Sequence, residues 1–270
     1  MITQKLQAEL RAMFNPDGSD LRKMQLRMLE MLRYIDKICR ENNIKYWLSS
    51  GTCLGAVRHG GFIPWDDDCD IEMFSADFKR LRRIILSDPQ SPFIWQDHST
   101  DSAYLAPYAK LRDPKSVLNE VTYNDKYYKF HGIYIDIFII KPSRSRLLKK
   151  IGNLIQILGL FKLNLIKNEK IRQILIHTNW MLIHYCFFPL LNLPDQLLGS
   201  NNQYRHVMGS LFLKPRKKST IGNTKRVLFE GSLFPIPEDP NQYLSMIYGD
   251  YNVLPDLDKV HSHISNITIE

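Results

Sequence analysis

The chain has 270 residues, of which 44% are hydrophobic, and a formal net charge of +8 at pH 7. These values exclude an intrinsically disordered chain and favour one large domain or one domain with an insertion. The four cysteines lack CxxC spacing and indicate neither a zinc ribbon nor a disulfide framework. The N-terminal stretch MITQKLQAEL lacks the apolar run of a secretory signal. We therefore expect a reducing, cytoplasmic location.

Apolar residues recur every three or four positions across residues 20–42, which predicts an amphipathic helix. The next stretch predicts a short strand at Lys45–Leu48, a small-residue turn, one helical turn, a Gly-Gly loop and a strand from about Asp68. We expect further elements as follows: a helix over ADFKRLRRIIL, and strands over YAKLRD and GIYIDIFII. The last is too apolar to lie anywhere but the centre of a sheet. Together these elements predict an α+β (mixed α/β) fold.

Residues 143–200 interrupt the alternation and predict an inserted helical lobe. The lobe separates a core at residues 1–142 from residues 201–270, which would complete the catalytic domain. Nearly all of the excess positive charge lies in its first half, which favours a peripheral contact with an anionic membrane surface. Residues 173–194 contain no charged side chain and are long enough to cross a bilayer, although polar residues and prolines interrupt them. A core or packing helix, an interfacial helix and a membrane span all remain open.

Asp66, Asp67, Asp68 and Asp70 crowd into the short stretch WDDDCD. Like charges this close repel one another unless a cation lies among them. Alternate side chains of a strand share a face, so we expect Asp68 and Asp70 to point the same way, about 7 Å apart. Such a carboxylate pair suits Mg²⁺ or Mn²⁺. We interpret Asp66 and Asp67 as loop-capping residues or as supports for the ligands.

A third carboxylate, Asp136, stands alone in the apolar strand GIYIDIFII. A buried charge is costly unless it is paired or bound to a metal ion. We therefore expect Asp136 to lie on a strand beside Asp68 and Asp70. Lys110 and Arg112, two apart on a predicted strand, would share a face and grip phosphate oxygens.

The small-residue turn at Ser50, Gly51 and Thr52 lies between a predicted strand and a helix, where backbone N–H groups bind phosphate. The chain thus presents a turn, then a strand with Asp-x-Asp, then a later strand with a third Asp. This is the order of elements in the nucleotidyltransferase (DNA polymerase β-like) fold. We expect that fold here, with the helical lobe inserted.

Four stretches resemble the successive motifs of the LicD family, the cholinephosphotransferases of bacterial surface glycans, whose wider clan includes the fukutin-related ribitol-phosphate transferases. The stretches are SSGTCLGAVRHGGFIPWDDDCDIEM, KLRD, GIYIDIF and YGDYNVLP. The resemblance covers about residues 30–142 and 228–260, and not the basic, apolar insertion. Ser50 stands where members of the family often have Gly. Residues 228–255, which are rich in Pro, predict a substrate loop followed by a short helix.

The resemblance implies transfer of a phosphocholine-type or other phospho-alcohol group from a CDP-linked donor, such as CDP-choline, to a sugar hydroxyl, with release of CMP. The acceptor would be a cell-surface glycan such as lipopolysaccharide, teichoic acid or capsule, or its lipid-linked precursor. Asp68 and Asp70 would hold Mg²⁺ against the diphosphate, and Asp136 would complete the metal site or take the acceptor proton. Arg58, within RHGGFIPW, would contact phosphate oxygens.

Two other functions fit parts of the pattern. Metal-dependent glycosyltransferases also bind a nucleotide diphosphate through Asp-x-Asp, but they carry a nucleotide-binding domain ahead of that motif, and only about 45 residues precede the turn here. A non-catalytic homologue that binds nucleotide would have no reason to keep three costly carboxylates. Nucleic acid is not the expected partner, because the basic residues accompany apolar helices and no groove studded with aromatic residues is indicated.

Overall fold

The computed structural model describes residues 2–120, 125–199, 201–257 and 264–269, and a mixed β-sheet lies at its centre. The strands follow the order β1-β2-β6-β4-β3, and β7 extends the sheet beside the end of β6, with β8 beyond it. β2 and β6 are parallel, and the other pairs in this sheet are antiparallel. The α+β expectation is confirmed. The strands are β1 (Trp47–Leu48), β2 (Asp70–Phe74), β3 (Ile94–Gln96), β4 (Ala109–Arg112), β6 (Tyr134–Pro142), β7 (Gln203–His206) and β8 (Arg216–Lys217).

The strand β6 is central, as its apolar sequence predicted, with β2 on one side and β4 on the other. Successive side chains of a strand point to opposite faces of the sheet, so the sequence of each strand divides into two sets. One set belongs to the large hydrophobic core: Ile71 and Met73 of β2, Ala109 and Leu111 of β4, and Ile135 and Ile137 of β6. The other set faces away from that core and carries the polar residues of the candidate site.

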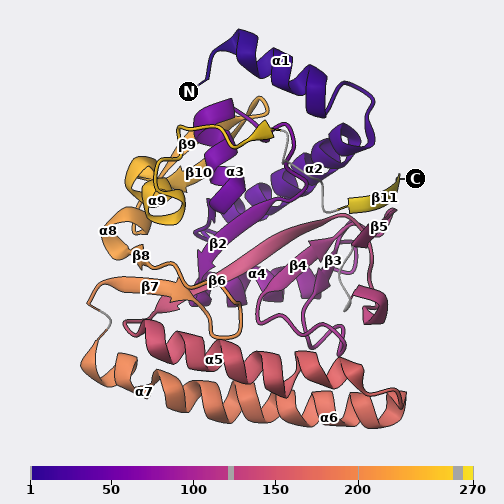
Figure 1. Ribbon diagram of the computed structural model, residues 1–270, viewed down its shortest axis with the longest axis vertical. Helices are drawn as coiled ribbons and strands as arrows, with labels where there is room; N and C mark the ends of the chain where they lie inside the picture. Colours follow the sequence, from indigo (N-terminus) through magenta and orange to yellow (C-terminus); the bar gives the residue numbers. More distant parts are fainter. Residues whose placement is uncertain (1, 121–124, 200, 258–263, 270) are drawn as a thin grey trace.

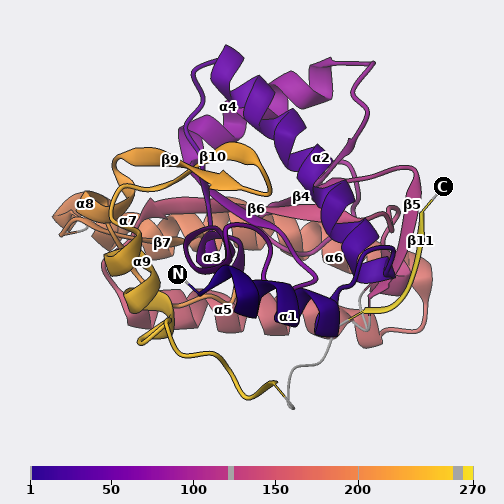
Figure 2. The same ribbon diagram turned by 90° about the horizontal axis from the view of Figure 1, so that it is seen from above.

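Two helices cover the core face of the sheet, α2 (Asp20–Glu41) and α4 (Ser75–Ser87). The side chain of Ser19 caps α2 by accepting a hydrogen bond from the Arg22 N–H, and an apolar stripe at helical spacing then packs inward. α4 follows β2 directly and buries Phe78 and Leu81. Figures 1 and 2 show α2 and α4 together on one side of the sheet. The two predicted helices are confirmed.

Residues 228–255 differ from the predicted loop. They contain most of an antiparallel hairpin, β9 (Thr224–Phe229) and β10 (Ser232–Pro237), and then the helix α9 (Pro240–Tyr248). Glu230 and Gly231 make the turn with φ angles of 49° and 75°, the left-handed conformation of a two-residue hairpin turn. Phe234 and Ile236 of β10 are buried in the main core, which is why a Pro-rich segment forms a strand here. The predicted short helix is confirmed.

The lobe is inserted between β6 and β7 and consists of three helices, α5 (Arg146–Gly159), α6 (Glu169–Leu182) and α7 (Phe188–Leu198). A 3₁₀ turn at Phe161–Leu165 follows α5, and a π-helical turn at Ile183–Phe187 joins α6 to α7 without a break. Figure 1 shows α6 and α7 in one continuous row at the lower end of the molecule, with α5 alongside it. A second apolar cluster attaches them to the rest of the fold, through Leu105, Leu160, Ile176, Ile183, Phe188 and Met208.

The continuous helix Glu169–Leu198 is, by length and composition, long and apolar enough to cross a membrane. Only 17% of its most apolar window is buried in the protein. A helix wholly enclosed in a core is therefore excluded, although one row of its side chains does pack inward.

The remaining elements are α1 (Gln4–Phe14), α3 (Ser50–Leu54) with a π-helical turn at Gly55–His59, a 3₁₀ turn at Asp125–Tyr127, α8 (Lys218–Ile221), and an antiparallel pair of β5 (Ser116–Glu120) and β11 (Ile264–Ile269).

Candidate active site

Asp70 and Asp136 are direct register partners on the parallel strands β2 and β6. Neighbouring strands lie about 4.8 Å apart and paired residues point to the same face, so the two side chains lie side by side. Both residues are nearly buried, with exposed fractions of 8% and 9%. The Asp136 N–H also donates to the carbonyl of Cys69, which fixes the register at this point. The expectation that Asp136 lies on a strand beside Asp68 and Asp70 is confirmed for Asp70, whereas Asp68 precedes β2, which begins at Asp70.

The aspartates act on one another electrostatically. Burial raises the pKa of Asp70, and the charges of Asp68, Asp136 and Asp66 raise it further. The pKa of Asp66 is also raised, first by burial and then by Asp68 and Asp67. Carboxylates from two separate stretches thus share one low-dielectric region and destabilise one another's charge, which a cation would relieve.

The carboxylate cluster fits a divalent cation by its chemistry. Within the described ranges, no three His, Cys, Asp or Glu side chains are already arranged as the ligands of one ion. The donors are nevertheless carboxylate oxygens, the type that Mg²⁺ and Mn²⁺ prefer, and Mg²⁺ sites in proteins commonly use only one or two carboxylates plus water and substrate phosphates. Asp68 and Asp70, with Asp136 beside them, are the residues that would hold such an ion.

The small-residue turn lies against the aspartates. The side-chain oxygen of Thr52 accepts a hydrogen bond of 2.8 Å from the Asp70 N–H. A Cβ atom at Gly51 would lie 2.8 Å from Asp66 Oδ2, so only glycine lets this carboxylate approach the turn so closely. Ser50 has a φ of 46°, in the left-handed region that favours glycine. Its N–H donates to the Tyr243 hydroxyl, which leaves Gly51 and Thr52 as the predicted phosphate-binding amides.

Lys110 lies opposite Asp136 on β4. Its ammonium nitrogen is 3.3 Å from Asp136 Oδ1 and 3.0 Å from the centre of the Tyr134 ring, so an ion pair and a cation–π contact hold it. Lys110 is nearly buried, as Asp136 is. The structure therefore places Lys110 at the edge of the carboxylate cluster.

Arg112 differs from its prediction. It shares a face with Lys110, as its spacing on the strand indicated, but it is fully buried. Its Nε donates to Gln96 Oε1 at 2.7 Å, and a terminal nitrogen donates to the carbonyl of Gly132 at 2.8 Å. The predicted contact of Arg112 with phosphate is therefore wrong. Its guanidinium instead joins β4 to Gln96 of β3 and to Gly132, just before β6, inside the protein.

Arg58 is also committed inside the protein. Its guanidinium donates to the carbonyl of Tyr251 at 2.8 Å and to His59 Nε2 at 2.9 Å. Burial lowers the pKa of His59 to about 4, so the ring is neutral and its Nδ1–H donates to Gln7. We correct the predicted phosphate contact of Arg58 accordingly. The residue anchors the segment YGDYNVLP beside the carboxylates instead.

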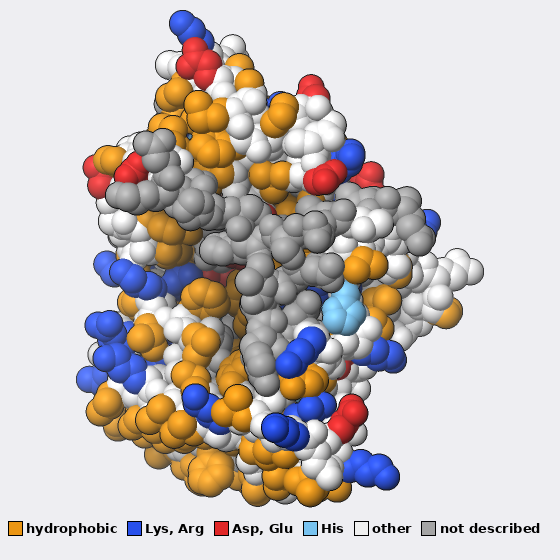
Figure 3. Space-filling view, turned by 45° about the vertical axis from the view of Figure 1, so that its right-hand side comes forward, with side chains coloured by type: hydrophobic (Ala, Val, Ile, Leu, Met, Phe, Trp, Pro, Cys, Tyr) orange, Lys and Arg blue, Asp and Glu red, His pale blue; other side chains and the backbone are white. Residues whose placement is uncertain are grey.

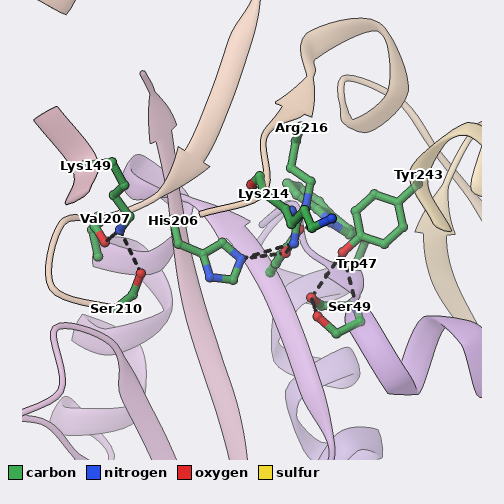
Figure 4. A network of polar contacts seen from close by, with 11 residues as sticks. Trp47, Ser49, Lys149, His206, Val207, Ser210, Lys214, Arg216 and Tyr243 are labelled. Atoms are coloured by element: carbon green, nitrogen blue, oxygen red, sulfur yellow. Dashed lines mark hydrogen bonds and ion pairs between the residues drawn. The ribbon is translucent and has the colours of Figure 1, made fainter. Parts of the chain in front are cut away.

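Sequence reasoning missed a buried ion network next to the aspartates, drawn in Figure 4. Glu72 lies two residues after Asp70 and therefore on the same face of β2. It is fully buried and accepts hydrogen bonds from Trp47 Nε1 at 2.9 Å and from His206 and Arg216, both at 2.7 Å. Burial alone would raise the pKa of Glu72, but Arg216 and His206 outweigh it and hold the pKa below its usual value.

The network reaches the small-residue turn through Tyr243 of α9. The Arg216 guanidinium lies 5.2 Å from the centre of the Tyr243 ring, and the Tyr243 hydroxyl lies 3.1 Å from Ser49 Oγ. Burial lowers the pKa of His206, so the ring is neutral and its Nε2–H donates to Glu72. The sequence signal for these residues was the charged Glu72 among the apolar residues of β2 that follow Asp70. Its partners His206 and Arg216 come from segments more than 130 residues away, which no local pattern reveals.

A second missed residue is Tyr248, at the end of α9 in the motif YGDYNVLP. Burial raises the pKa of its hydroxyl, and the charges of Asp70, Asp66 and Asp68 raise it further. Its side chain is thus within electrostatic reach of the carboxylates, and 45% of the residue is exposed. Tyr46, two residues before the end of β1, is buried, and its hydroxyl donates to Asp36 at 2.8 Å.

A family model and several known proteins are similar to parts of this chain, and the family model covers the part that holds the site. The family model LicD/FKTN/FKRP, nucleotidyltransferase domain, matches residues 43–151. The lipopolysaccharide cholinephosphotransferase LicD of Haemophilus influenzae is 31% identical over 120 residues, which are 44% of this chain and 43% of that protein. The human ribitol 5-phosphate transferase FKRP is 42% identical over 72 residues, 25% of this chain and 14% of that protein.

A further relative is the mouse ribitol-5-phosphate transferase FKTN, 33% identical over 76 residues, 28% of this chain and 16% of that protein. The matches to these three relatives span less than half the length of each. The family match includes the small-residue turn, the aspartates and Lys110, and it ends within α5 of the lobe.

Proposed function

We propose, from the LicD-family domain that this chain carries over residues 43–151, that the protein transfers a phospho-alcohol group to a hydroxyl of a glycan. The observation that carries the proposal is the pairing of Asp70 with Asp136, at the centre of a carboxylate cluster inside the matched region. A cluster of acidic side chains that raises its own pKa values suits a site that receives a cation and a phosphate together. The nucleotidyltransferase fold is part of the proposal.

The donor in this proposal is a CDP-linked alcohol. A sugar hydroxyl oxygen forms a bond to the phosphorus that carries the alcohol, the bond from that phosphorus to the CMP oxygen breaks, and CMP leaves with the electron pair. Asp68 and Asp70 would hold Mg²⁺ or Mn²⁺, which neutralises the charge that develops on the leaving phosphate. Asp136, with Lys110 at 3.3 Å, completes the ligand set or accepts the hydroxyl proton.

Other residues position the phosphates. The N–H groups of Gly51 and Thr52 at the start of α3 would bind the donor diphosphate, and the Thr52 side chain ties this turn to Asp70. Lys110 supplies a positive charge beside the carboxylates. Arg58 and the network of Glu72 and Arg216 hold the segments that surround the site and do not themselves contact the donor.

The relatives' names indicate the alcohols to test, phosphocholine for LicD and ribitol phosphate for FKRP and FKTN. The experiment measures CMP release from CDP-choline, CDP-ethanolamine, CDP-glycerol and CDP-ribitol, with Mg²⁺ and with EDTA. We expect one donor to release CMP, and EDTA to stop the release. Release from none of the four, in the presence of glycan acceptors, would favour a non-catalytic nucleotide-binding homologue. Turnover of a nucleotide sugar in its place would favour a glycosyltransferase.

Binding of the ion has a readout of its own. At a concentration 100 times its dissociation constant, a ligand of the folded state stabilises it by about 2.7 kcal/mol. We therefore expect Mg²⁺ to raise the melting temperature of the protein and to lose most of that effect in Asp68→Asn. Asp17→Asn is the matched control, because Asp17 is an exposed carboxylate far along the chain from the cluster, paired only to Arg11 at 3.1 Å among the contacts described.

A further inference from the structure

The three helices of the lobe expose an unusual amount of apolar surface. Leu154 on α5 is 54% exposed, Ile174 on α6 is 66% exposed, and Leu190 and Leu197 on α7 are 61% and 80% exposed. Figure 3 shows hydrophobic side chains gathered along the lower edge of the molecule, where these helices lie. Soluble monomers rarely expose contiguous apolar patches of this kind, so this face calls for a partner.

Basic side chains flank the apolar face at both ends of α5. Arg144, Arg146 and Lys150 are exposed at its beginning, and Lys162, Lys167 and Lys170 are exposed where the chain turns into α6. Glu169 is the one acidic residue among the residues from 143 to 173. The partner that this charge pattern complements is apolar inside and anionic at its border, which describes a bilayer with acidic headgroups.

The packing of the lobe fixes its orientation. The long helix Glu169–Leu198 would extend about 45 Å, and one row of its side chains, Ile176, Ile183 and Phe188, packs in a cluster with Leu105 and Met208 of the main body. To span a bilayer the helix would have to leave these contacts, because the sheet cannot enter the hydrocarbon region. If the helix keeps its contacts with the main body, it lies parallel to the bilayer surface. The side chains on its opposite side then face the bilayer.

A groove runs along this face between α5 and the long helix. It has a volume of about 410 Å³ and is lined by apolar residues such as Leu154, Leu158, Leu182 and Phe187. Its polar lining residue Asn179 donates to the carbonyl of Gly159 at 3.0 Å, so that amide is already bonded within the lobe. An apolar groove that opens toward a bilayer suits one hydrocarbon chain of a lipid in that bilayer.

We propose that α5, α6 and α7 form a membrane-docking face that lies in the interface of an anionic bilayer, with a lipid chain in the groove between α5 and the long helix. This resolves the three readings of residues 173–194 in favour of the interfacial one. The inference does not depend on the proposed transfer reaction, since it rests on residues outside the carboxylate cluster. It brings the enzyme to the surface where a lipid-linked acceptor would lie.

Sedimentation of the full chain with vesicles tests the proposal. We expect binding to vesicles of phosphatidylglycerol and phosphatidylcholine, and much weaker binding to phosphatidylcholine alone. The triple variant Leu154→Gln, Ile174→Gln and Leu190→Gln should weaken binding at least about tenfold. The matched control, Leu228→Gln with Leu233→Gln, alters two exposed leucines of the β9–β10 hairpin and should bind as the unmodified protein does.

Substitution of the basic residues is a second, independent test of vesicle binding. A cation at the surface of an anionic bilayer contributes a factor of about five in binding, so Lys150→Gln, Lys162→Gln and Lys167→Gln together should weaken it about a hundredfold. The control changes Lys37 and Lys225, which are exposed elsewhere. Equal binding by all variants, or equal binding to both kinds of vesicle, would overturn the proposal.

Two alternatives to interfacial docking, dimerisation through this face and a membrane-spanning long helix, would give different experimental results. If the face joins two copies of the chain, light scattering will show a dimer that the triple Gln variant converts to a monomer, with no vesicle binding. If the long helix spans the bilayer, the protein will resist extraction by alkaline carbonate. Either result rejects the interfacial proposal. Circular dichroism melting of each variant, and its CMP release with a water-soluble acceptor, separate loss of docking from loss of folding or of transfer.

Discussion

Asp70 lies directly opposite Asp136 on parallel strands, yet the two carboxylates have different surroundings. Asp136 has the Lys110 ammonium at 3.3 Å, whereas the pKa of Asp70 is raised by burial and by three neighbouring carboxylates, with Lys110 a smaller, opposing influence. The face of the sheet that carries both also holds Glu72 and Lys110, because the pleat sends the alternate, apolar residues of β2, β4 and β6 to the core. The same alternation that builds the core thus builds the site.

This difference predicts opposite effects on stability in metal-free buffer. Asp70→Asn removes a repelled charge and should raise the free energy of unfolding by about 1 kcal/mol. Asp136→Asn removes the carboxylate that lies 3.3 Å from the nearly buried Lys110 ammonium, and it should lower the free energy of unfolding by about 2 to 3 kcal/mol. Urea denaturation at pH 7.5 in the presence of EDTA measures both. Loss of stability in Asp70→Asn equal to that in Asp136→Asn would show that the cluster is not repulsive.

Glu72→Gln tests the buried network. It leaves Arg216 fully buried without its anion, so we expect a loss of about 3 to 5 kcal/mol in the free energy of unfolding. Glu9→Gln is the control, because Glu9 pairs with Lys5 at 4.0 Å on the exposed surface of α1 and should change stability by less than about 1 kcal/mol. Similar losses in the two variants would mean that the network does not support the fold.

Ser50→Gly tests the backbone of the turn. With a φ of 46°, Ser50 occupies a conformation that costs an L-residue about 1 kcal/mol and glycine nothing. We expect Ser50→Gly to stabilise the protein by about 0.5 to 1 kcal/mol in thermal unfolding. Ser50→Ala keeps the Cβ and loses the hydroxyl that lies 3.2 Å from Ser49 Oγ, so it should not stabilise. If Ala and Gly behave alike, the backbone conformation is not the cause.

The lowered pKa of Lys149 predicts that the free energy of unfolding depends on pH. Burial lowers its pKa from 10.5 to about 7, while its amine donates to Ser210 Oγ at 2.8 Å. Between pH 7 and 10.5 the unfolded chain therefore holds more protons at this residue than the folded one, and stability gains up to about 1.4 kcal/mol per pH unit as pH rises. Lys149→Met lacks this gain. The difference in unfolding free energy between the two proteins should grow in favour of the unmodified protein from pH 7 to 9, and a constant difference would contradict the assignment.

Local patterns were sufficient for much of the fold and for the proximity of Asp70 and Asp136. The spacing of Asp68 and Asp70, and the isolation of Asp136 in an apolar strand, indicated residues that needed a common partner. Period-two alternation also gave the correct face for Lys110 and Arg112. It could not tell what else occupies that face, so the commitment of Arg112 to Gln96 and Gly132 was missed.

Contacts between segments far apart in the chain could not be predicted from local sequence patterns. Glu72 meets His206 and Arg216 only because β7 and β8 return to the sheet after the lobe. Arg58 was interpreted from its motif, but its partner is a backbone carbonyl at Tyr251, which carries no side-chain signal. The lobe was predicted as helical from its composition, whereas the row that packs and the row left exposed follow from how it folds against Leu105 and Met208.

The most direct measurement is the rate of CMP release from the active CDP-alcohol in Mg²⁺, compared between the unmodified protein and Asp70→Asn. Removing one charged group from a site that stabilises a transition state costs about a hundredfold to a thousandfold in rate. We predict a loss of at least that size while Asp70→Asn keeps or exceeds the original melting temperature in EDTA. Release at the unmodified rate by a folded Asp70→Asn protein would contradict the account.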